Sequence, residues 1–482
     1  MSSNLNVRLS LSHPFIPSAT HLEEPYYALL DIQPVEDSGG ANRPPLNLVI
    51  VLDDSATMHH FQFTDEEKEY WMGLAISRDE IERGSADNRN AVYWKGQTLK
   101  EMRAAAVTPM ALATQAIKQL LNTLTPSDRV SVVIFADRLH TLFGDQDWSA
   151  FPNRCLENLD ALREQRLGVD IGTGTFMADA ITQAGETLAR NTSPYSINRL
   201  IVITDGIVQD PAVTLQRVTD VQERGYAITT IGIGEEFDEE FLIRIADNSR
   251  GEYHYAADTT ELVECLKREV TSLQAVAVTD MYMAVRGLEG AMVKEAFLVR
   301  PSMSLFDEIY TEDDWIRARI GDVSSAAPVG VLVQFIPAYS SPGQHMVAEI
   351  QLTWSYASAV TGSGKGNEKT VVTAEFTSDR DKVALVNAPV MDLVDRFTVY
   401  KYEREAQRAQ ERGDFELAKD KLGAATKQLH KLGEKDLAQD MEQQMATIGK
   451  SGGGDTVRLK RIKSTTRRLA NTNTNTDPDR LF

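Results

Sequence analysis

The segment LVIVLDDSATMHH, residues 48–60, carries the clearest structural signal in the sequence. Five apolar residues, enough for a buried strand, lead directly into Asp53, Asp54, Ser55 and Thr57. In open α/β sheets, ligands bind beyond the carboxyl ends of the strands. A buried strand followed by oxygen-bearing side chains therefore predicts a binding site at the edge of a mostly parallel sheet.

The pattern around this segment predicts two kinds of sheet. From residue 47 to about residue 271, apolar strands alternate with amphipathic helices, which is typical of a parallel sheet with helices on both faces. Residues 1–46 and 272–380 instead alternate apolar and polar positions, as antiparallel strands do. We expect these two flanking segments to join in one β-sandwich, with the α/β unit inserted between them.

The C-terminal third predicts helices and then a tail. Apolar residues recur at helical spacing in residues 386–448, and a helix stop at Gly413 followed by an N-cap at Asp414 predicts a helical hairpin. Residues 449–482 combine a Gly-rich linker, the basic run RLKRIKSTTRR and a Thr/Asn repeat. We expect this basic, Thr-rich tail to be disordered.

Three threonines of this tail suggest a regulatory alternative to a silent segment. Thr456, Thr465 and Thr466 lie among basic residues, where a Ser/Thr kinase could reach them. A phosphate there would offer acceptor oxygens to a phosphopeptide-binding reader.

The composition limits the possible partners and compartments. The net charge of −20, from 70 acidic and 50 basic residues, argues against binding to nucleic acid or to an anionic membrane. Cys155 and Cys265 are the only cysteines, which suits a reducing compartment. No stretch approaches the roughly 20 apolar residues that cross a bilayer, and the N-terminus lacks a signal-peptide pattern. We therefore expect a cytoplasmic protein.

Two further segments should bring oxygen donors to the same sheet edge. DIGTGTFMADA places Thr175 in a glycine-bracketed turn before a helix, and IVITDG places Asp205 after another apolar strand. Together with Asp53, Ser55 and Thr57, these residues form a set of two carboxylates and three hydroxyls. Such hard oxygen ligands suit Mg²⁺, Mn²⁺ or Ca²⁺ rather than zinc or copper.

The order D-x-S-x-T, then G-T in a turn, then T-D-G after a strand resembles the von Willebrand factor A (VWA) domain with its metal-ion-dependent adhesion site (MIDAS), in a prokaryotic intracellular protein. The segments TPSDRVSVVIFAD and ITTIGIGEEFDEEF add to the similarity over residues 47–271. The resemblance implies a six-stranded sheet in the order 3-2-1-4-5-6, with strand 3, RLHTLF, antiparallel. It also implies that Ser55, Thr57 and Thr175 contact the metal directly, while Asp53 and Asp205 act through water.

A cation held mainly by neutral hydroxyls keeps much of its charge and attracts a carboxylate from another molecule. The sequence therefore predicts a cation-dependent protein–protein interaction scaffold or adaptor that binds a partner's Asp or Glu, with no catalytic residues, in a setting such as Ser/Thr-kinase-linked signalling. Two alternatives remain open. One is a metal-assisted phosphoester hydrolase with Asp54 or a nearby histidine as base, and the other is a subunit of an AAA-type ATPase remodelling complex.

Residues 59–108 depart from the family pattern, because the first helix normally follows the motif at once. Two segments of this insertion, around residues 66–84 and 90–106, look partly helical. The insertion carries the aromatic residues Tyr70, Trp71, Tyr93 and Trp94. These side chains could form a lid or specificity surface, or simply fasten the insertion to the domain. Asp54 is expected to point away from the metal.

Two other motifs are rejected on their context. TGSGKGNEKT, residues 361–370, has Gly366 where a phosphate-binding loop needs Ser or Thr after Lys365, and a hairpin loop is expected instead. His59 and His60 are adjacent and lack the companions of a zinc site.

Overall fold

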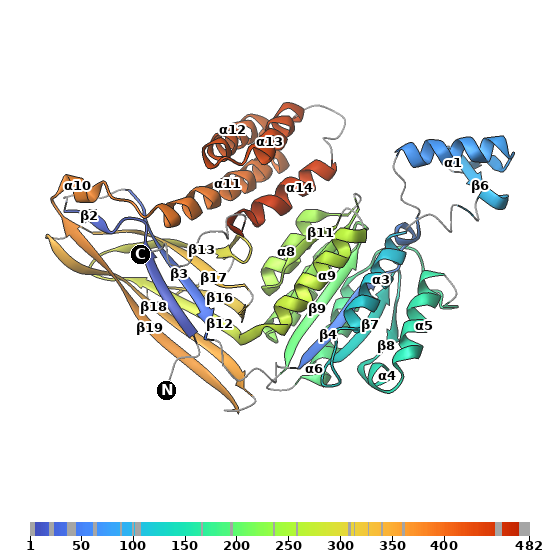
Figure 1. Cartoon of the computed structure of the whole chain (residues 1–482), viewed down its shortest axis with the longest axis horizontal. Helices are drawn as coiled ribbons and strands as arrows, with labels where there is room; N and C mark the ends of the chain where they lie inside the picture. Colours follow the sequence, from blue (N-terminus) through green and yellow to red (C-terminus); the bar gives the residue numbers. More distant parts are fainter. Residues whose placement is uncertain are drawn as a thin grey trace.

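The computed structural model describes most of the chain between residues 5 and 471 (Figure 1). The residues that it leaves out in this range are 19–23, 36–44, 61–64, 87–88, 99–100, 102–107, 165–166, 193–195, 235–236, 257–258, 307–309, 313, 326, 339–340, 359–361 and 449–455.

The α/β domain is built on a six-stranded sheet. Its strands are β4 (Leu46–Asp53), β7 (Arg129–Phe135), β8 (Leu139–Phe143), β9 (Ile197–Thr204), β10 (Ala227–Ile233) and β11 (Tyr253–Ala256). Their order is β11-β10-β9-β4-β7-β8, which is the predicted order 3-2-1-4-5-6. Only the β7–β8 pair is antiparallel among these neighbours, as expected for strand 3. The first strand therefore lies in the middle of the sheet, and all eight of its residues are buried.

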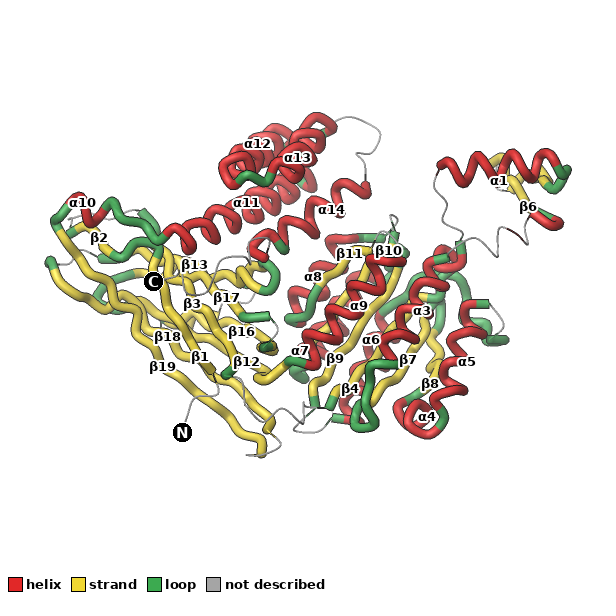
Figure 2. The backbone as a smooth tube through the Cα atoms, viewed as in Figure 1, coloured by secondary structure: helices red, strands yellow, loops and turns green. Residues whose placement is uncertain are grey.

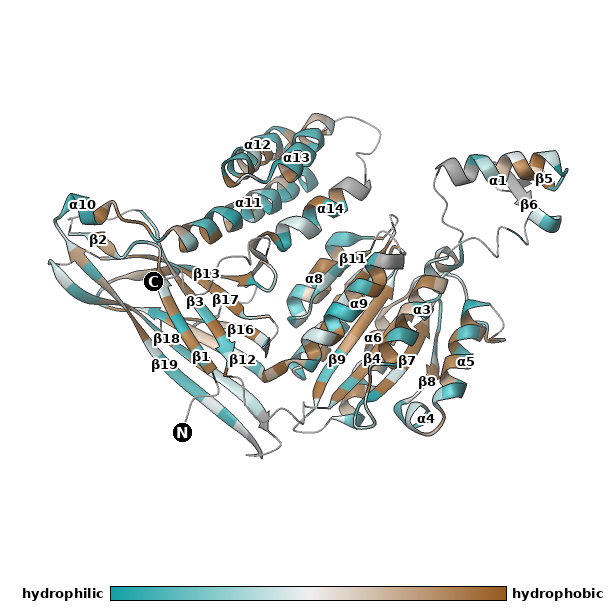
Figure 3. Cartoon of the chain, in the orientation of Figure 1, coloured by the Kyte–Doolittle hydropathy of each residue, from teal (hydrophilic) through white to brown (hydrophobic). Residues whose placement is uncertain are grey.

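Helices cover both faces of this sheet (Figures 1 and 2). One face packs on α3 (Pro109–Leu121), α5 (Pro152–Arg163) and α9 (Thr259–Gln274). The other face packs on α6 (Ala178–Asn191), α7 (Pro211–Glu223) and α8 (Glu239–Ser249). Because both faces are covered, the central strands are mostly apolar, which Figure 3 shows as brown arrows between helices that carry teal patches. Two of the helices, α5 and the short α4 (Asp145–Ala150) before it, were not predicted from the sequence.

The segments on either side of the α/β domain form one β-sandwich, as the alternation predicted. Its first sheet has the order β1-β3-β17-β13-β14 and its second the order β15-β16-β12-β18-β19-β2. The strands are β1 (Leu5–Leu11), β2 (Phe15–Pro17), β3 (Tyr26–Pro34), β12 (Val276–Gly287), β13 (Met292–Arg300), β14 (Ser304–Leu305), β15 (Tyr310–Glu312), β16 (Trp315–Ser324), β17 (Val329–Ile336), β18 (Gly343–Ser358) and β19 (Gly362–Thr377). N-terminal β3 pairs with β17, and N-terminal β2 pairs with β19.

A helical region packs on the outer face of the first sandwich sheet. It contains α11 (Ala388–Glu411), α12 (Phe415–Leu432) and α13 (Lys435–Thr447), preceded by the short α10 (Arg380–Val383). Strand β3 is apolar on both faces for this reason. Leu30 points into the sandwich core, whereas Leu29 joins the cluster with the helices.

The expectation of a disordered tail is wrong for residues 456–471. These residues form α14 (Thr456–Arg467) and the 3-10 helix η2 (Leu469–Asn471). The segment is ordered because it packs against other parts of the chain, with Ile462 and Leu469 buried in the cluster of the helical region. Thr466 is fully buried and donates a hydrogen bond to the carbonyl of Ile462, so it is not the kinase-accessible residue that the sequence suggested.

The insertion contains α1 (Asp65–Ser77) and an antiparallel hairpin of β5 (Ile81–Ala86) and β6 (Arg89–Trp94). The expectation that both segments are partly helical is confirmed, by α1 in the first and by helical residues 96–98 in the second, while the hairpin strands take up the rest of the described residues 81–94. In Figure 1, α1 and β6 lie apart from the helices that cover the sheet. Tyr70 is exposed and makes an edge contact with Trp71, while the side chains of Tyr93 and Trp94 lie outside the described part.

The rejected phosphate-loop motif lies in β19, within a strand hairpin rather than in the expected loop. Gly366 lies against the ring of Trp354 and Gly364 against Tyr356, so these glycines make room for aromatic neighbours on β18. No described helix is long and apolar enough to cross a membrane.

Candidate metal-binding site

The two carboxylates of the predicted site lie at the ends of neighbouring strands. Asp53 is the last residue of β4, and Asp205 follows directly after β9, which pairs with β4 in parallel. Both side chains are nearly fully buried. The register of two parallel strands therefore brings to one edge two residues that are far apart in the sequence.

The loop after β4 is organised by hydrogen bonds among the predicted residues. The backbone N–H of Ser55 donates to Asp53 Oδ1 at 2.8 Å. The Thr57 hydroxyl donates to Asp205 Oδ1 at 2.7 Å, and it lies 3.1 Å from the Ser55 hydroxyl. Because Thr57 has a single hydroxyl hydrogen, Ser55 is the donor in that second contact. Four of the five predicted residues thus form one connected chain.

The loop that carries Thr175 closes the site from another side. A Cβ placed on Gly206 would lie 3.0 Å from Thr175 Oγ1 and 3.4 Å from Asp53 Oδ2, so the two oxygens border the same small space. The backbone N–H of Ala56 donates to the Thr173 carbonyl at 3.3 Å, which joins this loop to the one after β4. The structure therefore brings all five predicted residues to one edge of the sheet.

Two aspartates that the sequence analysis did not single out hold the Thr175 loop. Asp137 follows β7 at the same edge and accepts hydrogen bonds from the N–H groups of Thr173 and Gly174, at 3.2 and 3.0 Å. Asp210 accepts from the N–H groups of Met177 and Ala178 at the start of α6, at 2.9 and 3.0 Å. Asp137 was detectable in principle, because it follows an apolar strand of the same sheet, as Asp53 and Asp205 do.

Thr204 was likewise not predicted from the sequence to belong to the site. Its hydroxyl donates to Asp53 Oδ2 at 2.5 Å and accepts from the N–H of Gly206 at 3.1 Å. Hydrogen bonds from two neighbours, Ser55 and Thr204, therefore hold both carboxylate oxygens of Asp53.

Asp53 lies in an environment that disfavours its negative charge. Burial raises the pKa of Asp53 to about 6, hydrogen bonds from Thr204 and Ser55 oppose the rise, and the charge of Asp54 adds to it. None of these groups is cationic. A positive ion beside Asp53 would supply the compensation that a buried carboxylate needs.

Asp54 points away from this cluster, as expected. Its carboxylate lies 2.7 Å from His59 Nε2, and both side chains are largely buried. Asp54 is therefore occupied by the first residue of the insertion rather than by the candidate site.

The donor set fits a hard divalent cation. It offers carboxylate and hydroxyl oxygens from three loops, and the absent Cβ of Gly206 leaves space between two of them. Among the described residues, no group of three or more His, Cys, Asp and Glu could hold a metal. The candidate site after β4 is not a group of that kind, because three of its five oxygen donors are the hydroxyls of Ser55, Thr57 and Thr175.

The sheet order and the three-loop oxygen site together define a VWA domain. The von Willebrand factor type A domain family matches residues 104–268, and the Sll0103-like, C-terminal alpha-helical domain family matches residues 388–472. The chain is therefore a VWA domain protein with an additional C-terminal helical domain. The first match begins near the end of the insertion, at residue 104, and the pairing of β4 between β7 and β9 places the D-x-S-x-T motif in the same domain.

Two bacterial relatives are similar to parts of the chain. The uncharacterized protein sll0103 of Synechocystis sp. is 21% identical over 268 residues, 54% of this chain and 58% of the relative. The uncharacterized protein YfbK of Escherichia coli is 24% identical over 181 residues, 36% of this chain and 29% of the relative. The chain thus spans less than two thirds of the length of both.

A solved structure extends the similarity in fold over nearly the whole chain. The von Willebrand factor type A protein from Catenulispora acidiphila aligns with a TM-score of 0.68 and 16% sequence identity, over 96% of both chains. At this identity the likeness concerns the fold alone. VWA domains commonly act as metal-dependent protein-interaction modules.

Proposed function

We propose that this chain binds a partner protein through a divalent cation held by Ser55, Thr57 and Thr175, with Asp53 and Asp205 behind them. The observation that carries the proposal is the hydrogen-bonded chain from Asp53 through Ser55 and Thr57 to Asp205. In that chain the Ser55 and Thr57 hydroxyls lie between the carboxylates, and their oxygen lone pairs could bind a cation while the Thr57 hydroxyl hydrogen stays directed at Asp205. Mg²⁺, Mn²⁺ and Ca²⁺ are the candidate ions.

A bound divalent ion would act as an electrophile for an acidic side chain of the partner. The residues of this chain determine how much of the ion's charge remains. Only two carboxylates serve the site, because Asp54 is held by His59. A donor set rich in neutral hydroxyls leaves the ion less neutralised than a set of four carboxylates would, which favours an external Asp or Glu.

The surroundings of the site suit a protein partner with apolar residues next to that acid. Phe176 follows Thr175 and is 42% exposed, and Ile207 follows Gly206 and is 65% exposed. Apolar side chains left exposed beside a polar site are typical of interaction surfaces. The partner proposed here therefore presents a carboxylate flanked by an apolar residue.

Hydrolysis is the less favoured function for this site. A metal-assisted hydrolase needs a general base close to the reacting water. Among the local candidates, Asp54 contacts His59 at 2.7 Å and His60 is exposed, and the hydrogen bonds of the described residues join none of these side chains to the five residues of the site.

The proposal is tested by metal binding and by partner capture. Isothermal titration with Mg²⁺ and Mn²⁺ should give a single site in the full chain, and Asp53→Ala and Thr175→Ala should weaken that binding about tenfold or more while circular dichroism stays unchanged. Asp54→Asn is the matched control, since it neutralises a neighbouring carboxylate that faces His59, and it should bind nearly as the wild type does.

For the partner, immobilised protein is incubated with peptides that contain an Asp or Glu next to a bulky apolar residue. Capture should require the cation and disappear with EDTA. Unchanged capture in EDTA and in both site variants would contradict the proposal.

A further inference from the structure

The segment 456–471, composed of α14 and η2 and called the latch below, lies where three parts of the molecule meet (Figures 1 and 2). On the VWA domain, Lys460 donates to the Phe237 carbonyl at 3.0 Å and lies over the Phe237 ring. On the sandwich, the N–H of Met303 donates to the Arg467 carbonyl at 2.6 Å. On the helical region, Arg396 of α11 donates to the Leu469 carbonyl at 3.1 Å. One short segment thus touches all three parts.

The surfaces that the latch covers are acidic. On the VWA side, α8 contributes Glu239, Glu240 and Asp247, and the facing helix α11 contributes the buried Glu403. Burial is the main reason that the pKa values of Glu239 and Glu403 are raised. Arg404 of α11 pairs with Glu240 at 2.7 Å. Three acids of this surface, Glu239, Asp247 and Glu403, lie outside that pair and are stabilised by other cations.

The latch provides those cations. Arg467 makes two hydrogen bonds to Asp247, at 2.6 and 3.0 Å, with both side chains almost buried. Lys463 lies 3.5 Å from Glu239 and 4.0 Å from Glu240. Removing one partner of a buried ion pair is strongly destabilising, because the remaining charge stays desolvated.

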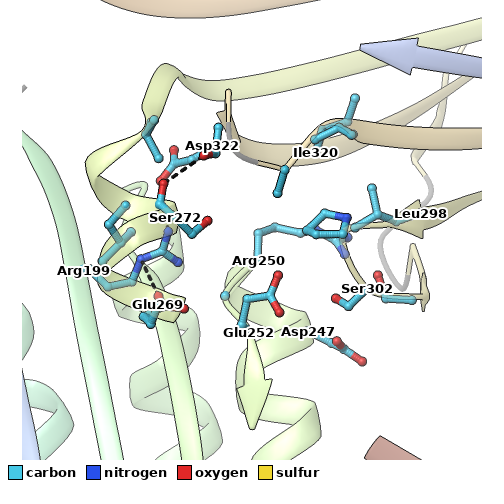
Figure 4. A pocket seen from close by; sticks show the side chains of 18 residues that line it. Arg199, Asp247, Arg250, Glu252, Glu269, Ser272, Leu298, Ser302, Ile320 and Asp322 are labelled. Atoms are coloured by element: carbon cyan, nitrogen blue, oxygen red, sulfur yellow. Dashed lines mark hydrogen bonds and ion pairs between the residues drawn. The ribbon is translucent and has the colours of Figure 1, made fainter. Parts of the chain in front are cut away.

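Close to Asp247, both polar and apolar side chains line the junction between the VWA domain and the sandwich. A cavity of about 70 Å³ lies there (Figure 4). Its lining includes Arg199, Asp247, Glu252, Ser272 and Asp322. Direct polar contacts cross this junction, such as Arg199–Asp322 at 3.4 Å and the hydrogen bond from Arg319 to the Gly225 carbonyl at 3.0 Å, and the latch adds to them.

We propose that the latch is a separable clamp that fixes the VWA domain against the helical region and the sandwich. While it is in place, its bases neutralise the acids of α8 and α11. When it withdraws, Glu239 and Asp247 lose these cationic partners, and the VWA domain, still joined to α11 by the Arg404–Glu240 pair, moves more freely about its connection from α9 to β12. The inference goes beyond the proposed function, because it concerns how the parts are held together and needs no metal.

The test is charge reversal in the full chain, measured in EDTA by hydrogen–deuterium exchange and small-angle X-ray scattering. Arg467→Asp should accelerate amide exchange in α8 and α14 by about tenfold or more and increase the radius of gyration, while the strands β4 and β9 keep their protection. Arg461→Asp is the matched control, since Arg461 is an exposed base of the same helix. It should change neither quantity.

The exchanged pair, Asp247→Arg with Arg467→Asp, should restore both measurements toward the wild type. Two results would overturn the inference. One is unchanged exchange and scattering in Arg467→Asp. The other is loss of protection in β4 and β9 together with α14, which would make the segment part of one cooperative core rather than a separable clamp. Neither result bears on cation binding, which is measured separately.

Discussion

At the scale of single residues, the candidate site depends as much on an absent atom as on its ligands. Gly206 lies between Thr175 and Asp53, and its backbone has an ordinary conformation, so only the lack of a Cβ distinguishes it. If a Cβ were added here, rotation of the neighbouring side chains could not restore the space. Asp53 is held by Thr204, and the Thr175 loop is held by its backbone hydrogen bonds.

Gly206→Ala is therefore expected to weaken Mg²⁺ binding without unfolding the protein. The new Cβ would lie 3.0 Å from Thr175 Oγ1, which is tight enough to displace that oxygen by a few tenths of an ångström. Isothermal titration should show an affinity reduced roughly tenfold. Gly73→Ala is the control, because nothing lies within 4 Å of a Cβ there, and wild-type affinity in Gly206→Ala would show that the space is not needed.

The sequence could predict a site residue where its position next to a strand is enough to place it, and could not where its role depends on a contact in the folded structure. Asp53, Ser55 and Thr57 were visible because strand and ligands are adjacent in the sequence, and Asp205 because its strand pairs in parallel with β4. Their role as metal ligands stays a prediction. Thr204 could not be assigned, because its contact with Asp53 depends on which way the side chain points at the end of β9.

At the scale of elements, the start of α6 is capped by a residue from the next helical segment. The Asp210 carboxylate accepts from two N–H groups of α6, although Asp210 itself precedes α7. The cap therefore ties the Thr175 loop to the loop that follows β9. The N–H of Gln209 adds a bond to the Thr175 carbonyl at 2.9 Å.

Asp210→Ala should lower the free energy of unfolding by about 1–2 kcal/mol, because two N–H groups at a helix start lose their acceptor. It should also weaken cation binding, since the loop with Thr175 loses its anchor. Chemical denaturation and metal titration measure the two effects. Asp220→Ala on α7 removes only an exposed carboxylate, and we expect a change within about 0.5 kcal/mol. Equal stability of the two variants would rule out the capping role.

Helices and strands could be predicted where their own apolar pattern indicates them. Most residues of the central strands are apolar, and the helices between them have apolar faces, so the alternation of strands and helices followed from the sequence, while the resemblance to the VWA family supplied the strand order. The helix α14 was missed because it carries many bases and no acid, a composition typical of a solvated tail. The acidic partners of these bases lie on α8, more than 200 positions earlier in the sequence, as the Arg467–Asp247 pair shows. Local composition cannot reveal such a partner.

At the scale of the whole molecule, the buried carboxylates under the latch predict a pH-dependent stability. Burial raises the pKa of Glu239 from its ordinary value to about 7, while Lys463, Tyr253 and Lys460 oppose the rise and Glu403 supports it. A raised folded-state pKa means that the native state binds this proton more tightly than the unfolded state does. The contribution of Glu239 is therefore full at low pH and is lost as the pH rises toward 7.

Between about pH 5 and pH 8, this carboxyl alone should reduce the free energy of unfolding by about 1–3 kcal/mol. Glu239→Gln cannot titrate, so its denaturation midpoint should depend less on pH and exceed that of the wild type at pH 8. Glu261→Gln on the neighbouring α9 is a control expected to keep the wild-type slope. The same pH dependence in the wild type and in Glu239→Gln would contradict this assignment.

The insertion of the VWA domain into the sandwich has a consequence for synthesis. Strand β3 pairs with β17, with Leu30 opposite Val331, and the whole α/β domain lies between these two strands in the sequence. The pairing can therefore form only after the α/β domain has been synthesised. At typical translation rates, roughly 300 residues take about 15–60 s to emerge. During that interval the VWA domain can complete its own core on the ribosome, while the hairpin of β1 and β3 keeps an apolar face without its native cover. The paired strands β1 and β3 therefore expose apolar residues such as Leu30 until β17 has been synthesised.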